Sequence, residues 1–244
     1  MTTMELPGVA GGYGCVIADP PWSFTDKGSR AAPDWKRRQQ GRYETMEVDA
    51  IAALPVREVV AGEAHLYLWT TDAHLLDGSA LQVARAWGFV PKHTLDWVKM
   101  RPPREDPRML VGDLASAWVT ALGLTTPRTR EDRRLLSRVR RYLRSMEGAN
   151  AVVGGQLQVG LGHWYRHTHE LVIFAVRGRA AAPRHDLLST FLAPRGRHSA
   201  KPGRLHELAE AMSPGPRLEL FARKNREGWT CWGDQCPGAL GRAA

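Results

Sequence analysis

Gly14-Cys15-Val16-Ile17-Ala18-Asp19-Pro20-Pro21-Trp22 is the stretch from which the fold can be read first. Its first five residues are small or apolar and predict a short buried strand. The strand runs directly into Asp19, and the two prolines that follow cannot continue a regular ladder of hydrogen bonds. In open α/β sheets, ligands bind beyond the carboxyl ends of the strands. Asp19 therefore stands where a functional side chain is expected.

Short apolar runs and helical periods alternate along most of the chain outside this stretch. We expect further strands at 65–69, 94–99, 171–176, 218–221 and 229–232, a loop at 23–42, and helices at 47–61 (broken or bent at Pro55), 75–87 (stopped by Gly88), 130–146 and 204–212. This alternation predicts an α/β fold with a mostly parallel sheet and helices on both faces.

Residues 101–155 interrupt the alternation, so the chain is predicted to be one domain, 1–244, with a basic helical insertion. Residues 101–150 contain 11 arginines, no lysine and 6 acidic residues, a net charge of +5. Thr129 and Asp132 have the spacing of a capping box at the start of the helix. An arginine-rich helix can clamp nucleic acid or dock a partner, including a second copy of the chain. A solvated face on a packed helix is the alternative.

The 244 residues carry a net charge of +9, which favours a polyanionic partner because basic side chains release counterions from phosphates. An arginine-rich composition without any such partner is the alternative. The three cysteines, Cys15, Cys231 and Cys236, form no CxxC pair and favour a reducing compartment. With no expected signal peptide or membrane span, the protein is predicted to be cytoplasmic.

The run Asp19-Pro20-Pro21-Trp22 suits methyl transfer to an adenine amine. The N6 amine is a poor nucleophile because its lone pair is delocalised into the ring, so a catalyst must hold both amine hydrogens with acceptors. The Asp19 carboxylate offers one acceptor. The Pro20 carbonyl offers a second at a fixed angle, because Pro21 forces Pro20 into an extended conformation. Trp22 can stack on the base. A purely structural turn is the alternative.

The motif resembles the catalytic motif of the adenine N6-methyltransferase family typified by the catalytic subunit of the messenger-RNA adenosine methylase. Further stretches resemble that family in the same order: Tyr43-Glu44-Thr45-Met46, Leu66-Tyr67-Leu68-Trp69-Thr70, Trp87-Gly88-Phe89, Trp97-Val98-Lys99, Gly160-Leu161-Gly162-His163-Trp164, Glu170, Arg197-His198-Ser199-Ala200-Lys201-Pro202, 214–223, Trp229 and Gly233-Asp234-Gln235. The resemblance covers nearly the whole chain except 101–155 and the ends.

This resemblance implies a Rossmann-like methyltransferase sheet, permuted so that the catalytic strand precedes the cofactor strand. It implies S-adenosylmethionine as cofactor, with Asp19 near its methionine end and Lys201 on its carboxylate. Around its ribose and adenine it implies Arg223, Asn225, Asp234 and Gln235. Relatives usually carry Asn-Gln or Asn-Glu where this chain has Asp234-Gln235.

The substrate side is expected to include Trp22, Tyr43, Arg166 and His167, the last two because they precede the strand led by Glu170. His163, His167 and His169 lie close in sequence, but no thiolates or carboxylates complete a ligand set, so no metal is expected. The tryptophans 69, 87, 97 and 118 are expected in the core.

The sequence thus favours an S-adenosylmethionine-dependent enzyme that methylates the N6 amine of adenine in nucleic acid. DNA of a bacterium or its phage is favoured, because the chain is small and basic and has no recognised RNA-binding module. An RNA or small-nucleoside acceptor remains open, since the chemistry is the same. The alternative from another class is a catalytically silent subunit that binds nucleic acid.

Overall fold

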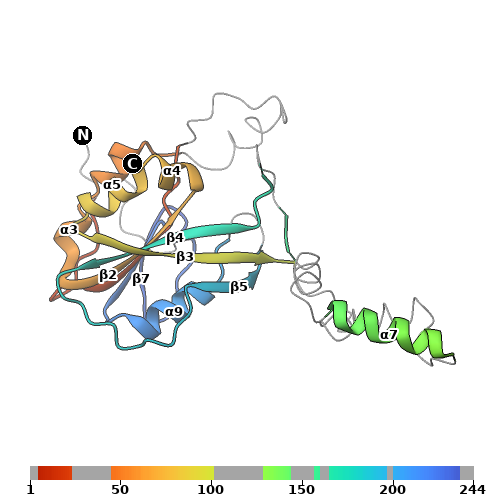
Figure 1. The fold of residues 1–244 in the computed structure, drawn as a ribbon. Helices are drawn as coiled ribbons and strands as arrows, with labels where there is room; N and C mark the ends of the chain where they lie inside the picture. The colour runs from red at the N-terminus through yellow and green to blue at the C-terminus, as the bar shows by residue number, and fades with distance from the viewer. Residues whose placement is uncertain are drawn as a thin grey trace. The chain divides into compact units, whose positions relative to one another are not determined.

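A computed structural model describes residues 5–23, 45–101, 129–143, 157–159, 165–196 and 200–236. Its centre is a seven-stranded sheet in the order β5-β3-β4-β2-β1-β6-β7 (Figure 1). The strands are β1 (Tyr13–Ala18), β2 (Val60–Thr70), β3 (Val90–Met100), β4 (His169–Arg177), β5 (Thr190–Pro194), β6 (Arg217–Leu220) and β7 (Thr230–Trp232). The helices are α2 (Val48–Ala52), α3 (Val56–Val59), α4 (Asp72–Leu76), α5 (Ser79–Ala86), α7 (Arg130–Leu143) and α9 (Arg204–Met212).

The sheet is mixed, so the direction of each strand determines which strand ends lie at the same edge. β1 is parallel to β2 and β6, and β6 is parallel to β7. β4 is antiparallel to both β2 and β3. The carboxyl ends of β1, β2, β3, β6 and β7 therefore lie at the same edge, where β4 begins. We call this the carboxyl edge.

Helices cover both faces of the sheet, as the sequence predicts (Figure 1). Val16, Ala18, Leu66 and Leu68 lie on one face, in a single buried cluster with Ile51 of α2 and with Val83 and Ala84 of α5. α9 covers the opposite face, where Ser213 at its end contacts His65 and Tyr67 of β2. These strand residues alternate between the faces because side chains along a strand point to opposite sides. The result is an α/β sandwich of the Rossmann-like methyltransferase type.

Two of the predicted helices, 47–61 and 75–87, have different bounds in the structure. The segment 47–61 breaks at Pro55 as predicted, but β2 already begins at Val60. The single helix predicted over 75–87 is wrong. Gly78 adopts a φ of 82°, which a helix cannot accommodate, and it separates α4 from α5. The stop at Gly88 is confirmed, with a φ of 88°.

Strand β5 is not predicted from the sequence. Its five residues, Thr-Phe-Leu-Ala-Pro, alternate between exposed and buried positions, but Leu192 on the exposed side is apolar as well, so the sequence shows no alternation of polar and apolar residues. The strand is held to its neighbour by main-chain bonds, for example from the Asp96 N–H to the Ser189 carbonyl at 2.8 Å. An edge strand of this kind depends on the partner strand and gives a weak sequence signal.

The chain divides into two compact units, 1–98 with 161–191 and 203–244, and 99–160 with 192–202. The second unit contains α7, whose predicted capping box is confirmed. The Asp132 N–H donates to Thr129 Oγ1 at 3.0 Å, and the Thr129 N–H donates to Asp132 Oδ2 at 2.9 Å. The predicted single domain with an insertion remains a prediction. No helix in the part of the chain that the structure describes is long and apolar enough to cross a membrane.

Candidate active site

Asp19 follows β1 directly and lies half-buried at the carboxyl edge. Ala18, the last residue of β1, is in register with Leu68 of β2 and with Leu220 of β6. The Asp19 N–H points to the Leu220 carbonyl at 3.5 Å, which continues the pairing of β1 and β6 by one residue. Asp19 therefore stands between the ends of β2 and β6, in the middle of the edge.

The turn after Asp19 is set by main-chain bonds to the chain that follows residue 44. The Trp22 N–H donates to the Pro20 carbonyl at 2.9 Å, and the Met46 N–H donates to the Pro21 carbonyl at 2.8 Å. The Ser23 N–H in turn donates to the Met46 carbonyl at 3.1 Å. The Pro20 carbonyl, which the sequence analysis assigned to the amine, thus already accepts one bond. Its second lone pair can accept another.

Trp22 does not lie where a base-stacking residue would be expected. Its side chain is 6% exposed and belongs to the apolar cluster on the side of α5. The indole Nε1–H donates to the Trp69 carbonyl at 3.0 Å, and the His74 ring stacks on the indole at 4.8 Å between centroids. A buried indole needs a partner for its N–H, and the end of β2 supplies it. These contacts assign Trp22 to anchoring the motif, and its stacking on adenine remains a prediction.

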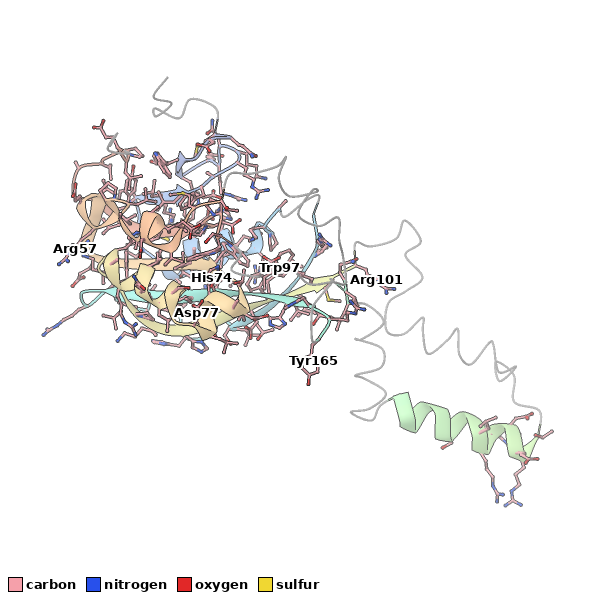
Figure 2. All side chains as sticks on the ribbon, turned by 90° about the horizontal axis from the view of Figure 1, so that it is seen from above. Arg57, His74, Asp77, Trp97, Arg101 and Tyr165 are labelled. Atoms are coloured by element: carbon pink, nitrogen blue, oxygen red, sulfur yellow. A yellow bond between two sulfur atoms is a disulfide. The ribbon has the colours of Figure 1, made fainter. Side chains whose placement is uncertain are left out.

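His74 is a residue that the sequence analysis did not single out. It is 3% exposed, and its ring nitrogens contact the Ser23 carbonyl at 3.0 Å and Ser79 Oγ at 2.9 Å. It thus joins the turn after the motif to the start of α5. Its sequence signal is weak, because a single histidine in the short helix Asp72-Ala73-His74-Leu75-Leu76 is more often structural than functional. Figure 2 shows the position of His74 among the side chains of the first unit.

The cofactor residues expected after β6 and β7 lie on the other side of Asp19. Phe221 follows β6 with a φ of 60°, an uncommon conformation for a non-glycine residue and one that often occurs at functional sites. A Cβ at Gly233 would lie 2.5 Å from the Ala222 carbonyl oxygen, so only glycine allows the two segments to pass so closely. Arg223 is half-buried, whereas Asp234 and Gln235 are exposed.

Asn225 contacts two cysteines rather than projecting freely from the turn. Its Oδ1 lies 2.7 Å from the Cys231 sulfur and 3.1 Å from the Cys236 sulfur. The two cysteines form a disulfide across the segment that carries Asp234 and Gln235. The spacing of the cysteines did not predict this bond. The cytoplasmic localisation remains a prediction.

The structure does not bring every predicted site residue together. Lys201 is half-buried two residues before the N-cap Gly203 of α9, and it belongs to the second compact unit, so its part in cofactor binding remains a prediction. Tyr43 lies outside the described residues.

On the substrate side, Arg166 and His167 are exposed just before β4. Because Leu171 of β4 is in register with Thr70, the residues before it lie beyond the end of β2, at the carboxyl edge. His167 Nδ1 lies 3.2 Å from Asp72 Oδ2, and His169 Nε2 lies 3.6 Å from Asp72 Oδ1. Asp72 was not predicted from the sequence.

The tryptophans 69, 87 and 97 are buried, as predicted, and Trp118 lies outside the described residues. His163, one of the three histidines considered for a metal, also lies outside them. Within the described ranges, no group of three or more His, Cys, Asp or Glu side chains is arranged to hold a metal ion.

A buried polar cluster lies behind β1, on the face covered by α9. Ser213 Oγ contacts His65 Nδ1 and the Tyr67 hydroxyl, each at 3.0 Å. Burial raises the pKa of the Cys15 thiol to about 12, and it also raises the pKa of Tyr67. Burial lowers the pKa of His65 below its ordinary value. All three groups are thus kept uncharged at neutral pH, which is typical of core residues rather than of proton donors at a site.

Comparison with known proteins agrees with a Rossmann-like methyltransferase fold. The profile of the MT-A70 family matches residues 13–111 and 145–235, and the unmatched stretch between them falls within the basic insertion. The type II methyltransferase M.MunI of Mycoplasma sp is 21% identical over 240 residues, which cover 92% of this chain and 78% of the relative.

Proposed function

This chain belongs to the MT-A70 family of S-adenosylmethionine-dependent methyltransferases, and on that premise we propose that it methylates the N6 amine of adenine in nucleic acid, with DNA as the favoured substrate. The family and the similarity to a type II methyltransferase support a methyltransferase acting on nucleic acid. The choice of adenine N6 rests on the residues at the carboxyl edge.

The observation that carries the proposal is the position of Asp19 and Pro20. The carboxylate and the carbonyl follow one another at the end of β1, between the ends of β2 and β6. The turn that presents them is held by the Trp22 indole and by main-chain bonds to Met46. Two acceptors on so constrained a turn suit a primary amine, which has two hydrogens to donate.

The chemistry follows from these two acceptors. S-adenosylmethionine, when bound, supplies a methyl group on a positively charged sulfur. The Asp19 carboxylate accepts one amine hydrogen, and the free lone pair of the Pro20 carbonyl accepts the other. This geometry favours a pyramidal nitrogen, whose lone pair would attack the methyl group that the cofactor supplies, with the sulfur as leaving group. Positive charge that builds on the nitrogen lies beside the Asp19 carboxylate, which also takes the amine proton and passes it to solvent.

The side chains after β6 and β7 have the chemistry that the cofactor requires. The exposed Asp234 carboxylate and Gln235 amide suit ribose hydroxyls, and the Arg223 guanidinium adds several donors. Asn225 lies beside them, with its amide oxygen facing the two sulfurs of the disulfide. The close passage at Gly233 holds the two segments together. By resemblance, Lys201 pairs with the methionine carboxylate.

A nucleic-acid substrate fits the net charge of +9 and the exposed Arg166 near the carboxyl edge. An amine inside a duplex cannot reach Asp19, so duplex DNA must present its adenine flipped out of the stack. Single-stranded DNA avoids that cost.

Transfer of a tritiated methyl group from S-adenosylmethionine to duplex DNA, single-stranded DNA, RNA and adenosine tests the proposal. Mass spectrometry of the nucleosides then identifies the methylated position. We expect N6-methyladenine in DNA and a loss of at least about 10²-fold in Asp19→Ala. Glu58→Ala is the matched control, because Glu58 is exposed on α3 before β2, at the opposite edge of the sheet. Methylation at another atom would refute the proposed reaction, and transfer to RNA or adenosine alone would refute DNA as the substrate.

A further inference from the structure

Asp72 joins two segments that are far apart in the sequence. It is the first residue of α4, directly after β2, and its side chain is 39% exposed. Its two carboxylate oxygens face different histidines, Oδ2 towards His167 Nδ1 at 3.2 Å and Oδ1 towards His169 Nε2 at 3.6 Å. One carboxylate thus holds the chain that enters β4 against the start of α4.

Asp72 can also stabilise α4 directly, and this effect differs from its contacts with the two histidines. An acidic residue in the first turn of a helix is stabilising because it faces the positive end of the helix dipole. That effect needs only the negative charge and no histidine. The cap itself is supplied by Thr71, whose Oγ1 accepts the His74 N–H at 3.3 Å. Replacement of Asp72 therefore leaves the cap in place.

The segment held by Asp72 presents side chains suited to a nucleic-acid strand. Tyr165 is 88% exposed, and Figure 2 shows it pointing away from the sheet. Arg166, the next residue, is exposed as well. An exposed aromatic ring can stack on a nucleobase, and a neighbouring guanidinium can bind the phosphate beside that base. A single exposed aromatic ring is ordinary on a protein surface, and what distinguishes Tyr165 is its place beside Arg166, just before β4 at the carboxyl edge.

The location matches the chemistry at Asp19. β2 lies between β1 and β4 in the sheet, so Asp72 follows the strand next to the one that ends at Asp19. We propose that Asp72 is a positioning residue that, through His167 and His169, orients Tyr165 and Arg166 to bind the nucleic-acid strand flanking the target adenine. This inference rests on the proposed function, because it assigns the strand-binding part of the same site.

Electrostatics alone makes the opposite prediction, which allows a sharp test. Removal of a carboxylate near a polyanion should strengthen binding. Loss of the positioning contact should weaken it. We expect Asp72→Asn to weaken binding of a fluorescein-labelled, adenine-containing single-stranded oligonucleotide by about two- to fivefold in fluorescence anisotropy, as for the loss of exposed ion pairs. The maximal methylation rate and the affinity for S-adenosylmethionine should stay within about twofold of wild type.

A double-mutant cycle separates the histidine contacts from the helix dipole. We expect His167→Gln/His169→Gln to weaken binding as much as Asp72→Asn, and the triple variant to bind no more weakly than either. Tyr165→Ala should weaken binding with no change in thermal stability. Asp77→Asn, which removes an exposed carboxylate at the other end of α4, is the matched control and should bind as well as wild type or better.

Each remaining outcome overturns one of the two proposals. Equal or stronger binding by Asp72→Asn, or additive effects of the aspartate and histidine changes, refutes the positioning role. Failure of the wild-type protein to bind the oligonucleotide refutes it too. Oligonucleotide binding that depends on Asp72 without any N6 methylation refutes the proposed function and leaves the strand-binding role intact.

Discussion

On one side of Asp19 the carboxyl edge is held by the main chain and by packing, and on the other side by exposed side chains. The segments that follow β6 and β7 lie so close together that Gly233 has no room for a Cβ. The disulfide between Cys231 and Cys236 closes the turn after β7. The chain before β4 is held to α4 by Asp72, whose histidine partners are each more than 40% exposed.

The difference matches what each side would bind under the proposed function. A cofactor is always the same molecule, so a rigid site can be preorganised for it and loses little entropy on binding it. A nucleic-acid strand varies in sequence and conformation, and exposed side chains can adapt to it. Four changes, from the largest expected effect to the smallest, test how far this contrast extends.

The substitution Gly233→Ala should disrupt the packing between the segments that follow β6 and β7. The new Cβ would meet the Ala222 carbonyl oxygen at 2.5 Å, and backbone on both sides leaves nothing flexible to move. We expect a loss of about 1–3 kcal/mol in the free energy of unfolding. Calorimetric titration should also show much weaker binding of S-adenosylmethionine. Gly62→Ala is the control, since its Cβ meets nothing within 4 Å. Wild-type behaviour of Gly233→Ala would show that this side is not rigid.

Loss of the disulfide tests the same side less severely. Cys231→Ser/Cys236→Ser should lower the stability by up to about 2 kcal/mol, because the bond closes only a short loop. Thiol titration of the denatured protein should detect one thiol, from Cys15, before treatment with a reductant and three thiols after it. Three thiols in the untreated protein would contradict the bond.

Trp22 lies between the two sides of the carboxyl edge. The substitution Trp22→Phe tests whether its indole serves packing or contacts the base. The phenyl ring lacks the N–H that donates to the Trp69 carbonyl, so we expect a loss of about 1 kcal/mol in stability. Trp87→Phe is the matched control, because Trp87 Nε1 donates to the Ile51 carbonyl at 3.1 Å elsewhere in the same cluster. Unchanged stability with a raised KM for the nucleic acid would instead favour stacking of Trp22 on the base.

Acidification should lower the stability of the folded protein only slightly, through His65 on the packed face beneath α9. Burial lowers the pKa of His65 in the folded protein below its ordinary value of 6.5, so the unfolded chain takes up the proton first. This contribution to stability is complete above about pH 6.5 and is lost as the pH falls below it. Melting temperatures between pH 7.5 and 5 should fall less in His65→Gln than in wild type. The exposed His93 provides the control, His93→Gln, and an equal slope in all three proteins would contradict the assignment.

Much of the fold follows from local pattern. The apolar run 14–18, the break at Pro55, the stop at Gly88 and the capping box at Thr129 all occur where the sequence predicts them. Gly78 was missed because a glycine inside an apolar helical period is compatible with a continuous helix, and only the packing of α4 and α5 requires its positive φ. The short β5 was missed because its pairing, rather than its composition, makes it a strand.

The candidate site divides in the same way. The sequence by itself determined that Asp19 and Pro20 end a buried strand, since an apolar run followed by two prolines allows little else. It also determined the order of the segments that resemble the family. Only the tertiary structure decided that the Trp22 indole is buried under His74, that Asn225 faces a disulfide, and that Asp72 holds two histidines. Strand ends are local events, whereas contacts between such distant residues depend on how the sheet aligns its strands.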